Sequence, residues 1–195
     1  KAVEKGILVC NSAGNEGDDS RWMTIITPAD AENVICVGGI DDDLEHYNHI
    51  SFSSYGPSAD KRLKPNVVAF GHAMVADPSN NKFTDAYGTS FASPLTAGFC
   101  ACAWQTMRNK TALEMKTEIE KSCDLYPYYD YAFGYGVPQA AYFTGEKKLA
   151  ERSFNLVQEK DGVKIVVPKI IENQDVFINV EGADGVLLGY YKVQS

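Results

Sequence analysis

Two short apolar runs that do not alternate with polar residues constrain the fold of this chain most strongly. They are Ile7-Leu-Val-Cys-Asn11 and Asn33-Val-Ile-Cys-Val-Gly38, and residues 66–69 form a shorter third run. A strand with one solvated face alternates apolar and polar residues, whereas a continuously apolar strand is covered on both faces. Because long connections separate the three runs, the sequence predicts an α/β fold with a parallel sheet covered by helices.

The residues from Thr89 to about Met107 are small or apolar on every side of a helical projection, which predicts a buried helix. Pro94 fits such a helix only in its first turn, so we expect the helix to begin near Thr89 or Ser90. Thr111-Ala-Leu-Glu114 is a capping box, which predicts a second helix running to about Cys123. The residues expected on the inner face of that helix are Ala112, Met115 and Ile119.

The composition changes after Gly145, so we expect one part at residues 1–145 and a small module at residues 146–195. Asp161-Gly162 and Asp184-Gly185 are turn signals of β-hairpins. They separate apolar runs that predict an all-β module of about four strands. These runs are Phe154–Val157, Val163–Val167, Val176–Val180 and Val186–Val193.

Charge and cysteine content exclude several classes of function. The chain carries 18 Lys and Arg residues against 26 Asp and Glu residues, a net charge of −8, which argues against a nucleic-acid partner. No apolar run approaches the ~20 residues that span a bilayer. The five cysteines contain no Cys-x-x-Cys pair, so a zinc or thioredoxin-type site is not expected. Cys10 and Cys36 are interpreted as small buried hydrophobic residues.

Ser90 stands between Gly88-Thr89 and the predicted buried helix, so its hydroxyl lies at a helix N-terminus. Unpaired backbone N–H groups and the helix dipole favour negative charge there. An acyl-transfer enzyme places its nucleophile at such a point, because the substrate carbonyl becomes an oxyanion. Taken alone, Ser90 is better explained as an N-cap, since serine is among the commonest N-cap residues.

Residues 12–17, Ser-Ala-Gly-Asn-Glu-Gly, follow the first predicted strand directly. The end of that strand places small groups beside a cleft, and Asn15 offers a side-chain N–H donor at its tip. Taken alone, Asn15 is better explained as an ordinary turn residue.

Together the two motifs carry a resemblance. Ser12-Ala-Gly-Asn-Glu-Gly17 followed by Gly88-Thr-Ser-Phe-Ala-Ser-Pro94 resembles the subtilisin-like serine proteases, the subtilases or peptidase S8 family. Three further segments match family landmarks in the same order: Phe52–Pro57, Lys64–Gly71 and Phe133–Gly136. The resemblance covers residues 1 to about 143 and implies the C-terminal part of a subtilisin-like catalytic domain.

The resemblance implies roles for the matching residues. Ser90 would be the acylating nucleophile, and Asn15 would donate to the oxyanion together with the Ser90 backbone N–H. The substrate-binding residues it implies are Ser12, Ala13, Gly14, Gly88 and Thr89. Family members usually have Met where Phe91 stands, and Asp and Pro where Asn66 and Phe70 stand. Asn66 and Phe70 occupy structural positions, so we expect them to change the local loop shape and not the chemistry.

The resemblance implies that the catalytic His and Asp motifs of the family would come before the point where this chain begins. His46 and His49 lie in the polar loop Asp41–Ile50 and are predicted to be surface residues, and His72 is interpreted as structural. Residues 41–43 are interpreted as a solvated loop. Subtilases often bind calcium, but no motif here assigns a metal or cofactor site.

Residues 1–6 resemble the end of a helix that stops at Gly6, so the chain looks like part of a larger domain. Dividing the sheet would expose the edge of the strand at residues 7–11, and such an edge promotes aggregation. We therefore expect the chain to pair with its N-terminal half or to dimerise across that edge.

Three functions are considered. The first is a serine endopeptidase acting on polypeptides, present as a fragment that is inactive alone. The second is a non-catalytic binding or scaffold relative. The third, an esterase of the α/β-hydrolase type, is disfavoured because Ala92 replaces the second glycine of its Gly-x-Ser-x-Gly elbow and no Asp and His follow in the required order. The family resemblance implies a secreted, cell-surface or periplasmic location.

Overall fold

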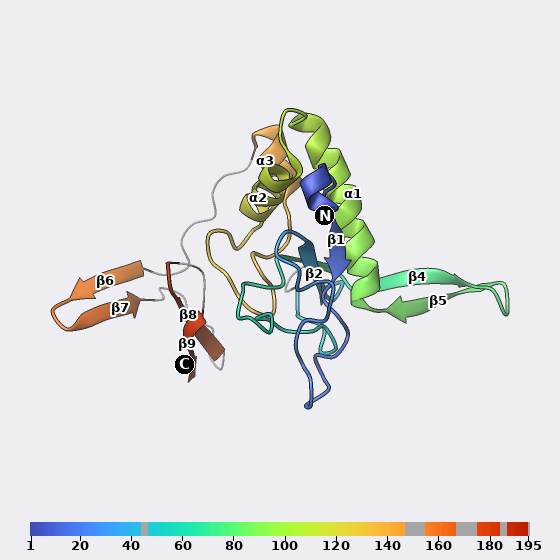
Figure 1. The fold of residues 1–195 in the computed structure, drawn as a ribbon. Coiled ribbons are helices and arrows are strands. Elements are labelled where there is room, and N and C mark those ends of the chain that lie inside the picture. The colour runs from blue at the N-terminus through green and yellow to red at the C-terminus, as the bar shows by residue number, and fades with distance from the viewer. Residues whose placement is uncertain (44–46, 147–154, 167–174, 184–186, 195) are drawn as a thin grey trace. The chain divides into compact units, whose positions relative to one another are not determined.

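The computed structural model of the chain describes residues 1–43, 47–146, 155–166, 175–183 and 187–194 (Figure 1). Backbone contacts divide the chain into two compact units, Lys1–Lys147 and Lys148–Ser195. The first unit holds a parallel sheet with its helices, and the second holds two β-hairpins.

Three parallel strands form the sheet, in the order β1 (Cys10–Ser12), β2 (Ile35–Ile40) and β3 (Val67–Phe70). The parallel sheet predicted from the apolar runs is confirmed. Every residue of β2 is buried, as expected of a strand covered on both faces. The strand β1 begins three residues later than residue 7, because Ile7 is 56% exposed and precedes the ladder of hydrogen bonds.

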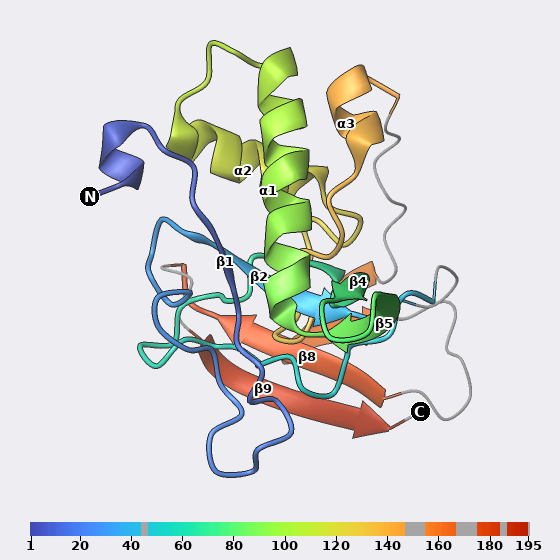
Figure 2. The same cartoon turned by 90° about the vertical axis from the view of Figure 1, so that its right-hand side faces the viewer.

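The helix α1 (Thr89–Thr106) crosses one face of the sheet (Figure 2). The core between them is buried and entirely apolar, and α2 (Ala112–Ser122) completes it. Its members are Ile35, Val37, Val67, Ala92, Cys100, Ala103, Met115, Ile119 and Cys123. The other face of β2 packs Cys36 against Ala13, Ile25 and Ala29, so loop residues rather than a helix cover that side.

The extent predicted for α1 is confirmed, but the prediction that it is buried all round is wrong. Leu95 is 53% exposed, and Ala97, Gly98, Ala101 and Cys102 are also exposed. Leu95 also borders a cavity between α1 and β3, whereas Ala97, Gly98, Ala101 and Cys102 lie on a side of α1 that is left open. A small, apolar helix face is therefore open in the part of the chain that the structure describes.

Pro94 does not lie in the first turn of α1, contrary to the expectation. Counting from Thr89, it is the sixth residue of the helix, and its ring nitrogen has no proton to donate to the Ser90 carbonyl four residues earlier. Both residues are exposed, and at an exposed position water can replace a missing helical hydrogen bond.

The capping box of α2 is confirmed. The Glu114 N–H donates to Thr111 Oγ1 at 3.3 Å, and the Thr111 N–H donates to Glu114 Oε2 at 2.7 Å. The predicted inner face is buried. Gly6, expected to stop a helix, is left-handed with φ +85° and ends the short 3₁₀ helix η1 (Val3–Lys5). The sequence did not predict α3 (Ala140–Thr144) or the antiparallel hairpin of β4 (His72–Asp77) and β5 (Lys82–Tyr87).

The two edges of the sheet differ. The Tyr135 N–H donates to the Asn66 carbonyl at 2.9 Å, and the Val68 N–H donates to the Gly136 carbonyl at 3.0 Å, so residues 134–136 cover the outer edge of β3. Gly134 permits this approach, since its φ is +61° and a Cβ there would lie 2.5 Å from the Asn66 carbonyl oxygen. No strand within the described ranges pairs with the outer edge of β1.

Asn66, where the family usually has Asp, joins three elements. Its Oδ1 accepts from the Cys36 N–H at 2.8 Å and from Lys64 Nζ at 3.0 Å, and its Nδ2 donates to Glu120 Oε1 at 2.7 Å. Lys64 Nζ also donates to the Val34 carbonyl at 2.6 Å, and burial lowers the pKa of this lysine to about 8. The asparagine amide both accepts and donates here, whereas an aspartate carboxylate could only accept and would face the Glu120 carboxylate.

The second unit contains two separate antiparallel hairpins. One joins β6 (Asn155–Glu159) to β7 (Gly162–Val166), and the other joins β8 (Asp175–Glu181) to β9 (Leu187–Gln194). The hairpin predicted at Asp161-Gly162 is present, with Gly162 paired to Glu159. The signal at Asp184-Gly185 lies outside the described residues. Every residue of β6 and β7 is exposed, so a packed all-β module stays a prediction.

Replacing Asn66 with alanine should lower the free energy of unfolding by about 3 kcal/mol, because buried donors lose their acceptor. Asn80→Ala at the exposed tip of the β4–β5 hairpin is the matched control and should change it by less than about 0.5 kcal/mol. Urea denaturation measures both variants. Equal losses for the two variants would contradict the role given to Asn66.

Candidate active site

The end of β1 and the start of α1 bring the two predicted motifs together. The Thr89 N–H and the Thr89 hydroxyl both donate to Asn15 Oδ1, each at 2.9 Å. Thr89 is 1% exposed, while Asn15 and Ser90 are exposed. A buried threonine therefore holds the asparagine beside the exposed serine.

These hydrogen bonds fix which end of the Asn15 amide faces outward. The carbonyl end, Oδ1, receives two donors from Thr89, so Nδ2 remains as the outward donor. Nδ2 lies 3.6 Å from the point where a Cβ on Gly88 would stand. A side chain at position 88 would enter the space beside this donor, and glycine leaves that space open.

The Thr89 hydroxyl also contacts the backbone of Gly14. It lies 3.2 Å from the Gly14 carbonyl and 3.4 Å from the Gly14 N–H. Gly14 has φ +118°, and a Cβ there would come within 2.5 Å of Glu16 Oε2 and 2.6 Å of Ser54 Oγ. Only glycine fits position 14, two residues beyond the end of β1.

Ser90 is not the N-cap of α1, because Gly88 occupies that position and makes no side-chain capping bond. Ser90 is the second residue of the helix, where backbone N–H groups lack intrahelical acceptors. The Thr89 N–H is paired with Asn15 Oδ1 and the Phe91 N–H with the Gly88 carbonyl at 3.0 Å. The Ser90 N–H therefore joins Asn15 Nδ2 as a second donor at an exposed helix N-terminus.

His72 was interpreted as structural, and the geometry agrees with that interpretation. Its Nε2 lies 2.8 Å from Asp85 Oδ1 and its Nδ1 lies 3.2 Å from Asp42 Oδ2. Its ring stacks on Tyr87 with a centroid distance of 4.7 Å. The hydrogen bond to Asp85 raises the pKa of His72 most, with a smaller contribution from Asp42. Asp42 pairs with His72 while its side chain stays 71% exposed, as expected of a solvated loop.

His49 is not a surface residue, contrary to the prediction. Its ring stacks on Tyr55 at 4.4 Å and meets Phe133 edge-on at 5.9 Å, and burial lowers its pKa to about 4. The polar residues around His49 gave no sign of this packing, because one aromatic partner, Tyr55, lies just beyond the loop and the other, Phe133, comes from a distant part of the chain. His46 lies outside the described residues.

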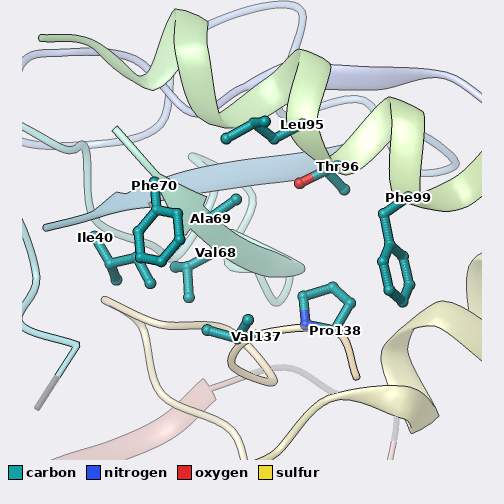
Figure 3. Close-up of a pocket in the computed structure, with 9 residues that line it drawn as sticks. All are labelled: Ile40, Val68, Ala69, Phe70, Leu95, Thr96, Phe99, Val137 and Pro138. Carbon is teal, nitrogen blue, oxygen red and sulfur yellow. The ribbon is translucent and has the colours of Figure 1, made fainter. Parts of the chain in front are cut away.

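An apolar cavity of about 200 Å³ lies between α1 and β3 (Figure 3). It is lined by Ile40, Val68, Ala69, Phe70, Leu95, Thr96, Phe99, Val137 and Pro138. None of the candidate site residues lines it, so it is separate from the Asn15–Ser90 site. Among the residues with described positions, no group of three or more His, Cys, Asp or Glu side chains is arranged to hold a metal ion. No helix within those ranges is long and apolar enough to cross a membrane.

The parallel sheet and its helices define an α/β fold. The Asn15 amide and Ser90 lie beyond the carboxyl ends of the strands, which is where open α/β sheets usually carry their binding sites. The sequence profile of the subtilase family matches residues 1–136. The chain therefore belongs to the subtilase family of serine peptidases, and the predicted resemblance is confirmed.

Curated relatives agree with this assignment. The chain is 34% identical over 146 residues to serine protease AprX of Bacillus subtilis (strain 168), covering 64% of this chain and 33% of AprX. It is 37% identical over 124 residues to the thermophilic serine proteinase of Bacillus sp. (strain AK1), covering 63% of this chain and 27% of that protein. The chain thus spans a third or less of these two relatives.

Solved structures show the same fold. The S41 psychrophilic protease matches with a TM-score of 0.59 at 22% identity, over 71% of this chain and 50% of that chain. Sphericase matches with a TM-score of 0.58 at 22% identity over the same shares. The subtilisin-like parallel sheet that the sequence predicted is therefore confirmed.

The His72 contacts predict a pH-dependent stability of the β4–β5 hairpin. Because folding raises the pKa of His72, its stabilisation is complete below its ordinary pKa of 6.5 and is lost as the pH rises through the raised value. The free energy of unfolding of the wild type minus that of His72→Gln should therefore fall between pH 6 and pH 9. Urea titrations at these pH values measure it, and a pH-independent difference would contradict the role of Asp85 and Asp42.

Proposed function

We propose that this chain forms the nucleophile-bearing part of a serine endopeptidase that cuts polypeptides through an acyl-enzyme on Ser90. The observation that carries the proposal is the pair of outward donors beside Ser90. Asn15 Nδ2 is oriented by the two Thr89 hydrogen bonds, and the Ser90 N–H lies at the N-terminus of α1. Serine peptidases of the same family provide the precedent.

In this mechanism the Ser90 hydroxyl oxygen attacks the carbonyl carbon of the scissile peptide bond. The carbonyl oxygen becomes negatively charged and receives hydrogen bonds from Asn15 Nδ2 and the Ser90 N–H. Both donors are held in place before the reaction, so they need little rearrangement as the charge develops. The helix N-terminus adds a favourable dipole at the same point.

The substrate would lie along the small residues at the end of β1. We propose that Ser12, Ala13 and Gly14 form one wall of the pocket for the residue before the scissile bond. Gly88 leaves room for the substrate backbone. Thr89 lies below the surface and holds Asn15 in place by a hydrogen bond to its Oδ1.

The base that deprotonates Ser90 is proposed to come from the upstream part of the catalytic domain. Neither histidine with a described position suits the role, because His72 is held by two carboxylates and His49 is packed between aromatic rings. The isolated chain is therefore expected to be inactive. The second candidate function is that of a non-catalytic scaffold relative. It is favoured because His72 and His49 are both held in contacts of their own and neither is placed as a base for Ser90.

The proposed chemistry uses no cofactor, and we assign no residue to calcium, which many subtilases bind. We propose that the protein acts outside the cytoplasm, as the family resemblance implies.

The test is covalent labelling of the longer protein with a fluorophosphonate, which reacts with an activated serine. Labelling is expected in the wild type and should be lost in Ser90→Ala, while Ser93→Ala, three residues on in the same helix, should still label. Asn15→Leu should lower kcat by about 10²–10³, the loss known for the equivalent donor of a subtilisin. Absence of labelling in a folded wild-type protein would contradict the endopeptidase proposal and favour the hypothesis of a non-catalytic scaffold.

We also propose that the chain associates through the outer edge of β1 and the open face of α1. The occupant is its own N-terminal half or, in its absence, a second copy of the chain. Two observations support this: β1 ends the sheet, and small apolar residues of α1 are exposed. Unpaired strand edges and apolar helix faces both favour association.

The isolated chain should therefore form dimers or larger species, which multi-angle light scattering detects. Ala101→Glu places a charge on the open face of α1 and should weaken association, whereas Thr117→Glu on the exposed face of α2 should not. A monodisperse monomer at every concentration tested would contradict this proposal.

A further inference from the structure

Two cysteines meet where β1 packs under α1. Cys10 Sγ in β1 and Cys100 Sγ in α1 lie 4.0 Å apart, although 90 positions separate them in the chain. Cys100 is 3% exposed and belongs to the core, while Cys10 is only partly buried at the edge of that core. Cys10 is therefore the member of the pair that lies closer to solvent.

The other cysteines are placed differently. Cys36 is buried in the cluster on the opposite face of the sheet. Cys102 is exposed on the outer side of α1. Cys123 is buried in the same core as Cys100, and its thiol donates to the Ile119 carbonyl at 3.3 Å. The Cys10–Cys100 contact is thus the thiol pair with one partly buried member and one core member.

We propose that Cys10 and Cys100 are a disulfide-forming pair that a small-molecule disulfide, such as oxidised glutathione, converts into a covalent bond between β1 and α1. To form the bond, the sulfur atoms must approach from 4.0 Å to about 2.05 Å.

The environments of the two thiols decide which one reacts first with the small-molecule disulfide. The contact with Cys100 lowers the pKa of the Cys10 thiol, while the same contact and burial raise the pKa of Cys100. Cys10 is therefore the thiolate that attacks the small-molecule disulfide and releases one thiol of the oxidant. Cys100 then loses its proton and attacks the Cys10 sulfur of the mixed disulfide, releasing the second thiol. The two protein thiols are oxidised, and the reagent is reduced to two thiols.

The bond would join the two elements that carry the candidate site, because β1 leads to Asn15 and α1 begins beside Ser90. It would also close a long loop of the unfolded chain, which raises stability mainly by restricting that state. For a domain of this size the expected increase in Tm is about 10 °C.

The test treats the purified protein with oxidised glutathione, then denatures it in an alkylating reagent, digests it and analyses the peptides by mass spectrometry. The expected product is a Cys10–Cys100 linked peptide, lighter by two hydrogens than the sum of its parts, with a higher Tm. Cys10→Ser and Cys100→Ser should both lose this product and the gain in Tm. Cys102→Ser, on the same helix, is the matched control and should keep both.

Recovery of alkylated Cys10 and Cys100 from protein whose Cys102 has reacted with glutathione would overturn the proposal. A Cys100–Cys123 linkage would overturn it as well. If the Cys100 variant does not fold, Cys10→Ser still decides the question, because Cys10 lies at the partly exposed margin of the core. The measurement requires no catalysis, so its outcome is independent of the role proposed for Ser90.

Discussion

The contact between Thr89 and Asn15 is the interaction on which the candidate site depends. Two short hydrogen bonds from one buried residue occupy a single acceptor atom, Asn15 Oδ1. They join the end of β1 to the first residue of α1, and they decide that the amide presents its N–H end beside Ser90. Without them, Asn15 would be an exposed loop residue free to adopt several rotamers. The sheet and helix bring the motifs together, and this contact sets their orientation.

The sequence predicted the main elements because their signals are local. Continuous apolar runs marked the three parallel strands, and the capping box of Thr111 and Glu114 marked the start of α2. The pairing of Asn15 with Ser90 was different. Each residue alone fitted an ordinary cap or turn, and only the order of several landmarks along the chain connected them. The hydrogen bonds of Thr89 could not be predicted from spacing.

The predictions that were wrong concern the surroundings of a residue or segment and not its place in the chain. His49 lies in a polar stretch, but Tyr55 and Phe133 cover its ring. The helix α1 is uniformly small and apolar, but its outer face stays uncovered by the described residues. The β4–β5 hairpin was missed although residues 78–81, Pro-Ser-Asn-Asn, are typical of a turn between two strands. For His49 and α1 the environment depends partly on other segments, whereas the hairpin had a local turn signal that the sequence analysis did not use.

The two edges of the sheet differ in whether they can pair with a further strand. At β3, residues 134–136 already use the outward backbone groups of Asn66 and Val68, so a further strand has little to pair with there. At β1 the backbone is not capped in this way by any described strand. Any enlargement of this sheet must therefore be built onto β1, which stands next to Asn15. Growth of the sheet and completion of the candidate site would then occur on the same side of the molecule.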